Sequence, residues 1–176
     1  MDDDRELMRR VAASDLDAFR EIVIRHQQSA WQIAYRYLGN RHDAEEIAQE
    51  AFLNILDNAG KYKPSAKFST YLYRVVANLC FDHSRKKQPR YVDDLLVRES
   101  DGPLPLDKLA AAEREQAVQA ALDQLSERQR MAVVLRYYQD LSLKEIAAAM
   151  NATAKAVERL LAAGRQALSR HLDNII

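Results

Sequence analysis

Cations and aromatic rings alternate along one stretch of the chain, from Lys61 to Lys87, in which Asp82 is the single acid. This combination suits single-stranded nucleic acid, because cations pair with phosphates and ring faces stack on unpaired bases. The basic residues are Lys61, Lys63, Lys67, Arg74, Arg85, Lys86 and Lys87, and the interleaved aromatic residues are Tyr62, Phe68, Tyr71 and Tyr73. The stretch predicts a single-strand site, although for Phe68 and Tyr73 a place in the core is equally open.

A second candidate site lies around Asn151, where two helical segments meet at the spacing of a helix-turn-helix. Asn tolerates the left-handed backbone that such a turn requires. The segment after Thr153 would then offer Lys155, Glu158 and Arg159 to a DNA major groove. The apolar or small residues at the expected helix contact are Ile146, Ala147, Met150, Val157 and Leu160. An ordinary helical hairpin fits the same pattern, so this motif alone leaves both interpretations open.

The helical segment after Asp43 carries an acidic face around an apolar side chain. Helical spacing gathers Glu46, Glu50 and Asp57 with Leu53, on the side opposite the apolar stripe. A leucine exposed among carboxylates suits a basic protein partner. A solvated acidic face explains the same residues, because isolated exposed leucines are common.

No arrangement typical of an enzyme or a metal centre occurs in the sequence. Cys80 and His83 lie one helical turn apart, but two ligands do not complete a metal site. Neither a glycine-rich phosphate loop nor a nucleophile-and-base signature is present. We therefore expect no catalytic residues, no metal and no cofactor, with a buried thiol and a surface imidazole as the simplest explanation of this pair.

The composition excludes further classes of protein. The 176 residues include 26 basic and 26 acidic side chains, so any binding of nucleic acid requires local clusters of charge. Cys80 is the only cysteine, which excludes an internal disulfide. No apolar run reaches membrane-spanning length, and the acidic start is unlike a secretory signal. The expected compartment is therefore the cytoplasm, without membrane insertion.

Helical periodicity and capping residues predict an all-α protein. Ser14 is the expected N-cap of the first helix, and Gly39 follows the end of that helix. Two serines that precede Gln or Glu by three residues, in Ser126–Gln129 and Ser142–Glu145, predict capping boxes. The predicted helices cover residues 14–38, 43–59, 68–87 and 109–125, and three more begin at Ser126, Ser142 and Thr153.

The periodicity fails between Gln88 and Asp107, where prolines, Gly102 and acidic residues gather. Two small helical domains joined by a flexible acidic linker are the economical arrangement. The expected boundaries are 1–88 for the first domain, 89–108 for the linker and 109–176 for the second domain.

Two independent blocks of the sequence carry a resemblance to a known family. The first comprises the run from Asp43 to Phe52, followed by Phe68–Leu72, Asn78, Asp82 and Arg85–Lys87; the second runs from Ser126 to Leu168. These blocks resemble regions 2 and 4 of the extracytoplasmic-function group of bacterial RNA polymerase sigma factors. Their order and fixed spacings make a chance match much less probable than a match to either block alone.

The resemblance implies a non-enzymatic protein that brings core RNA polymerase to promoters and helps melt the DNA, under the control of an anti-sigma factor. Its implied partners are the β′ clamp and β flap of the polymerase, and promoter DNA in duplex and single-stranded form. The implied β′ clamp contacts are Asp43, Glu46, Gln49, Glu50 and Leu53. The implied contacts to the minus-ten element are Tyr62, Lys63, Lys67, Tyr71, Arg74, Asn78, Arg85 and Lys86. The implied contacts to the duplex minus-thirty-five element are Ser142, Lys144, Lys155, Glu158 and Arg159.

Two other hypotheses remain at this point. A stand-alone transcription regulator would use the helix-turn-helix as a dimer and bind duplex DNA without polymerase. A thiol- or metal-dependent sensor or enzyme would instead be organised around Cys80 and His83.

Overall fold

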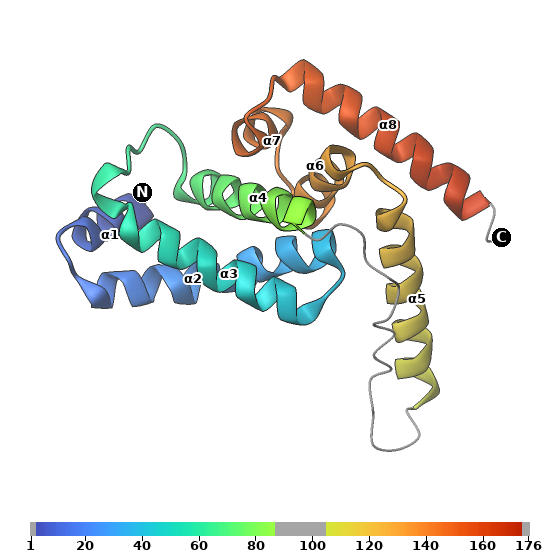
Figure 1. Ribbon diagram of the computed structural model, residues 1–176, viewed down its shortest axis with the longest axis horizontal. Coiled ribbons are helices and arrows are strands. Elements are labelled where there is room, and N and C mark those ends of the chain that lie inside the picture. The colour runs from blue at the N-terminus through green and yellow to red at the C-terminus, as the bar shows by residue number, and fades with distance from the viewer. Residues whose placement is uncertain (1–2, 87–104, 174–176) are drawn as a thin grey trace.

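The computed structural model describes residues 3–86 and 105–173, which form eight α-helices and one short 3-10 helix (Figure 1). This confirms the predicted all-α class. Most of the predicted linker, from residue 89 to residue 104, lies outside the described residues. The first helix after it begins at Leu106, so helical structure starts slightly earlier than the sequence indicated.

The first group of helices surrounds one apolar core. Ile22, Ile33, Ile55, Leu72 and Val76 contribute fully buried side chains from three successive helices. These residues recur at the helical spacing of one apolar face on each helix, which is why the three helices pack together. The helices of this group are α1 (Asp3–Ala12), α2 (Leu16–Leu38), α3 (Arg41–Asp57) and α4 (Phe68–Lys86), with the 3-10 helix η1 (Ala59–Lys61) after α3.

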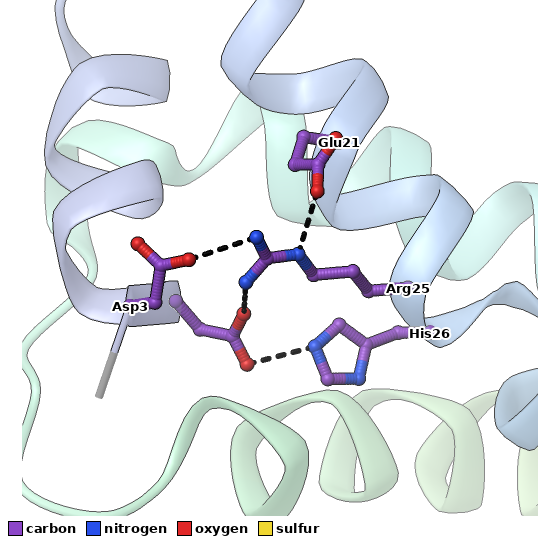
Figure 2. Close-up of polar contacts among 5 residues, drawn as sticks. Asp3, Glu21, Arg25 and His26 are labelled. Atoms are coloured by element: carbon purple, nitrogen blue, oxygen red, sulfur yellow. Dashed lines mark hydrogen bonds and ion pairs between the residues drawn. The ribbon is translucent and has the colours of Figure 1, made fainter. Parts of the chain in front are cut away.

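Helix α1 was not predicted, and polar contacts attach it to α2 (Figure 2). The Arg25 guanidinium lies 2.8 Å from Asp3 Oδ2, 3.3 Å from Asp4 Oδ1 and 2.8 Å from Glu21 Oε1. His26 Nε2 lies 2.8 Å from the other carboxylate oxygen of Asp4. The acidic start of the chain is therefore part of the fold.

The cap of α2 differs from the prediction by one residue. Asp15, and not Ser14, is the N-cap, because its carboxylate accepts a hydrogen bond from the Ala18 backbone N–H at 3.0 Å. Ser14 lies in the preceding turn with a φ of 68°. Gly39 ends α2 as predicted, and its φ of 69° is a left-handed conformation that glycine adopts without strain.

The second group of helices includes the predicted helix-turn-helix. Both predicted capping boxes are present: Ser126 caps with Gln129, and Ser142 caps with Glu145. Asn151 joins the last two helices with a φ of 50°, in the left-handed region as expected. The helices are α5 (Leu106–Asp123), α6 (Glu127–Tyr138), α7 (Leu143–Met150) and α8 (Ala154–Asp173).

The two groups of helices pack directly against each other. In Figure 1, α4 lies between the α2–α3 pair and α7, and α7 contacts α4. Helix α6 contacts α2, where an Arg130 guanidinium N–H donates to the Tyr37 carbonyl at 2.9 Å. Sequence periodicity did not predict this arrangement, because its contacts join residues far apart in the chain.

Candidate functional site

The acidic face of α3 lies at the surface. Glu46, Gln49 and Glu50 are exposed, and Leu53 leaves 58% of its surface accessible among them. Exposure of a large apolar side chain to water is unfavourable, and burial of that side chain against a partner would lower the free energy. The structure thus places these four residues on one accessible surface.

Asp43 does not belong to that surface. Its residue is only 5% exposed, and its carboxylate lies 3.3 Å from Nε2 of His83 on α4. This buried position separates Asp43 from the other four residues of the predicted set, which lie at the surface. Asp43 lies one helical turn before Ile47, a buried residue, so the same periodicity could have placed it on the inner face.

A groove of about 720 Å³ lies beside the acidic face, between α2 and α3. Its apolar lining includes Phe19, Val23 and Trp31 from α2, together with Phe52 and Leu53 from α3. None of the three α2 residues was identified as part of a binding surface from the sequence. All three are half-buried, so they serve both the packing of α2 and the wall of the groove.

A second pocket, of about 410 Å³, lies where the loop after α3 meets the start of α4. Tyr62, Lys63, Tyr71 and Arg74, all predicted from the basic and aromatic stretch, line it together. Lys61 of the basic stretch also lines the pocket, as do four residues that the prediction of a binding site did not include: Asn58, Ser65, Ala66 and Thr70. Small and amide side chains carry no charge or aromatic signal in a sequence, so most of these residues could be found only from the fold.

Aromatic rings support the wall of this pocket. The ring centroids of Tyr62 and Tyr71 are 5.1 Å apart, and Phe68 lies 6.3 Å from each. Phe68 is fully buried and Tyr73 is 7% exposed, which resolves both in favour of core packing. Burial raises the pKa of Tyr71, so its hydroxyl stays neutral at physiological pH. The half-buried ring of Tyr71 offers a face for stacking on a base.

The predicted cations of the minus-ten set, together with Asn78, divide into two groups. Lys63, Asn78 and Lys86 are exposed, and Arg85 is exposed 3.8 Å from Asp82. In contrast, Lys67 and Arg74 contact helix α7 of the second group of helices. The predicted minus-ten residues are thus arranged along one helix and its preceding loop, but two of them have protein partners in this structure.

The helix-turn-helix presents its predicted residues at the surface. Ser142 and Lys144 lie at the start of α7, and Lys155, Glu158 and Arg159 lie in the first half of α8; all five are exposed. The side chain of Thr153 accepts a hydrogen bond from the Ala156 backbone N–H at 3.1 Å, which fixes the start of α8. Exposed donors and cations at these helix starts can reach phosphates and base edges.

Little supports a site at Cys80. Its side chain is fully buried, and burial raises the pKa of the thiol, so the unreactive protonated form predominates. Within residues 3–86 and 105–173, no three His, Cys, Asp or Glu side chains are grouped as a metal centre requires. No helix among the described residues has the length and apolar composition to cross a membrane.

Comparison with known proteins agrees with these observations. Residues 22–90 match the family Sigma-70 region 2, and residues 115–168 match Sigma-70, region 4. The ECF RNA polymerase sigma factor SigW of Bacillus subtilis (strain 168) is 35% identical over 182 residues, covering 97% of each chain. The ECF RNA polymerase sigma-E factor of Escherichia coli (strain K12) is 28% identical and covers 98% of this chain and 96% of its own.

A solved structure shares the fold. The structure of CnrH in complex with the cytosolic domain of CnrY superposes with a TM-score of 0.77 at 24% identity, covering 97% of each chain. Its similarity extends over both groups of helices. From the two family matches and the full-length similarity to SigW, the chain belongs to the extracytoplasmic-function (ECF) RNA polymerase sigma factors.

Proposed function

We propose that this sigma factor binds core RNA polymerase through α3, captures the melted minus-ten element at α4 and holds the duplex minus-thirty-five element with α7 and α8. The observation that carries this proposal is the pocket at the start of α4, where Tyr62, Lys63, Tyr71 and Arg74 converge. A pocket with both cations and aromatic rings suits an unstacked base and its phosphates better than it suits a duplex.

The docking surface consists of Glu46, Gln49, Glu50 and Leu53, with the groove between α2 and α3 beside it. Its acidic rim and apolar centre fit a basic helical partner, which in this family is the β′ clamp of the polymerase. Apolar burial of Leu53 supplies affinity, and the carboxylates select the partner by charge. Asp43 is buried beneath this surface, where it stabilises the helix, and it makes no contact with the partner.

Opening of the promoter is driven by binding energy alone. Unpairing and extruding a base costs a few kcal/mol, whereas stacking on an aromatic ring contributes about 1–3 kcal/mol per base. Lys63 in the wall of the pocket and Asn78 beyond it are exposed, so they can hold the adjacent strand. The family's activity then requires no nucleotide, metal or catalytic residue in this chain.

The second group of helices binds the upstream duplex. Ser142 and Lys144 contact phosphates, and Lys155 and Arg159 reach into the major groove from α8, with Glu158 as an acceptor for base donors. The β flap of the polymerase holds this domain at the correct distance from the first one. Because α8 carries few cations, we expect the affinity of this contact to depend only weakly on salt concentration.

An anti-sigma factor controls the protein in the cytoplasm. The structural relative CnrH is solved in complex with the cytosolic domain of CnrY, and a second structural relative, the sigma factor RpoE, with the anti-sigma factor NepR. By this similarity, we assign to our chain a protein inhibitor that covers its polymerase-binding or DNA-binding surfaces.

The proposal is tested by transcription in vitro with purified bacterial core polymerase on a pool of promoter fragments, followed by sequencing of the transcript starts. We expect discrete new starts, with shared upstream elements, only when this protein is added. A protein that binds duplex DNA tightly without polymerase, and adds no starts, would be a stand-alone regulator.

A further inference from the structure

Side chains of α2 hold Asp4 of α1 at both of its carboxylate oxygens (Figure 2). Oδ1 lies 3.3 Å from Nη1 of Arg25, and Oδ2 lies 2.8 Å from Nε2 of His26. Asp3 and Glu21 each hold the same guanidinium at 2.8 Å, so Arg25 is fixed in position. A carboxylate accepts but does not donate hydrogen bonds, so His26 donates from Nε2. This contact fixes the orientation of the imidazole ring.

The imidazole ring of His26 packs against the first residue of α4. The ring centroids of His26 and Phe68 are 4.9 Å apart, with an angle of 58° between the ring planes. This separation and tilt are typical of favourable aromatic contacts. Phe68 is fully buried and His26 is half-buried, so the two rings have little freedom to move.

Phe68 in turn supports two rings in the wall of the pocket at the start of α4. Tyr62 and Tyr71 line this pocket, and the ring centroid of each lies 6.3 Å from that of Phe68. Phe68 and His26 lie behind this wall and are not lining residues. A continuous path of contacts thus runs from Asp4 through His26 and Phe68 to the aromatic wall.

Helix α1 supports the same pocket at a second point. It contacts the 3-10 helix η1, which contains the lining residue Lys61 and directly precedes Tyr62. Both helices have buried apolar residues, Leu7 and Met8 on α1 and Ala59 on η1. The position of the loop that forms one side of the pocket therefore depends on α1 as well as on α4.

We propose that His26, held by Asp4, is a positioning residue of the minus-ten pocket, through which α1 preorganises the aromatic wall for an unpaired base. This inference rests on the proposed function, because it takes Tyr62 and Tyr71 to be the rings on which the base stacks. A ring that is already in position loses less conformational freedom on binding than a mobile ring does. Partly exposed ion pairs contribute little to folding, so loss of the Asp4 carboxylate should loosen the wall without unfolding the protein.

The test measures how tightly the complex of this protein with core polymerase binds a single-stranded oligonucleotide, by fluorescence anisotropy. The oligonucleotide covers a minus-ten element found by the transcription experiment. Asp4→Ala removes the acceptor that holds His26, and His26→Gln keeps a donor for Asp4 but removes the ring from Phe68. Glu6→Ala is the matched control, since it removes a carboxylate of α1 that pairs with Arg9 at the surface.

We expect Asp4→Ala and His26→Gln each to weaken binding of the oligonucleotide about threefold, and Glu6→Ala to leave it unchanged. Helical content, measured by circular dichroism, should be the same in all three variants. A double-mutant cycle with Tyr71→Ala separates positioning from general support of the fold. If Asp4 acts through the aromatic wall, Asp4→Ala should cause a further loss of less than about 1.5-fold once Tyr71 is replaced, because coupled residues are not additive.

Two results would overturn the inference: full binding by both Asp4→Ala and His26→Gln, or an undiminished effect of Asp4→Ala in the Tyr71→Ala background. Tyr71→Ala alone tests the proposed function, and it should weaken binding about tenfold. If it does so and either result is obtained, the pocket remains the site of the melted strand and only the positioning role is rejected. If Tyr71→Ala binds as tightly as the parent, the proposed function itself fails at this pocket.

Discussion

Gly164 of α8 lies so close to Val133 of α6 that a Cβ atom added to the glycine would lie 2.9 Å from Val133 Cγ2. A glycine within a helix costs about 1 kcal/mol relative to alanine, so its presence in α8 needs a reason. The close approach of the two helices supplies it, because the β-branched Val133 has little freedom to move away.

This relationship predicts the effect of Gly164→Ala. Helix propensity alone would stabilise the protein, but the clash with Val133 should outweigh it and destabilise the second domain by about 1 kcal/mol net. The free energy of unfolding in urea measures the effect. Ala162→Gly, at an exposed position of the same helix, is the comparison and should cost about 1 kcal/mol by propensity alone. Stabilisation by Gly164→Ala would refute the packing argument.

The docking face is tested by combining Leu53→Glu with Glu50→Lys. Both side chains are exposed, so the fold should persist while affinity for core polymerase falls at least about tenfold. Binding is measured with fluorescently labelled protein and core polymerase, and helical content by circular dichroism. Arg20→Ala changes an exposed residue of α2 outside the groove lining and should leave the affinity unchanged. A double variant that binds as tightly as the parent would exclude this face.

The N-cap of α2 predicts a dependence of stability on pH. Hydrogen bonding from the Ala18 backbone N–H, followed by that from Arg10, lowers the pKa of Asp15. A lowered pKa in the folded state contributes stability above the unfolded pKa, and this contribution is lost as the pH falls through the folded value. Asp15→Asn keeps a capping oxygen without a titrating group, so its melting temperature should fall less steeply below about pH 5.

The matching variant Asp15→Ala removes the cap itself. We expect its melting temperature at neutral pH to fall by about 2–4 °C, while Asp15→Asn stays closer to the parent. Differential scanning calorimetry over a pH series measures all three proteins. Equal acid sensitivity in the parent and the Asn variant would show that Asp15 does not contribute to it.

The fold was largely predictable because its signals are local. Periodic apolar residues gave the positions of α2, α3 and α4, and the capping boxes marked the starts of α6 and α7. Helix α1 was missed because its short apolar face, with Leu7, Met8 and Val11, lies within a strongly charged segment. Ser14 was mistaken for the cap because Ser and Asp are both good caps and stand side by side.

The candidate site was less predictable, and for a physical reason. The aromatic ring of Tyr62 and the charge of Arg74 can be recognised in the sequence. The wall of the pocket also depends on the path of the loop after α3, which only the fold determines. The contacts of Lys67 and Arg74 with α7 join residues more than seventy positions apart, and no periodicity encodes such pairs. Burial of Asp43 was encoded, since it follows the spacing of Ile47.

The pocket at the start of α4 is central to the proposed function, and one measurement tests its role most directly. Permanganate footprinting of unpaired thymines should be performed on a promoter from the transcription experiment, with polymerase saturated by the parent, by Lys63→Ala or by Asn78→Ala. Arg20→Ala serves as the exposed-cation control. We predict that both site variants reduce thymine reactivity at the minus-ten element about tenfold, while recruitment to the promoter, measured by DNase protection, changes little. Equal thymine reactivity with the parent and both site variants would contradict the assignment of this pocket to the melted strand.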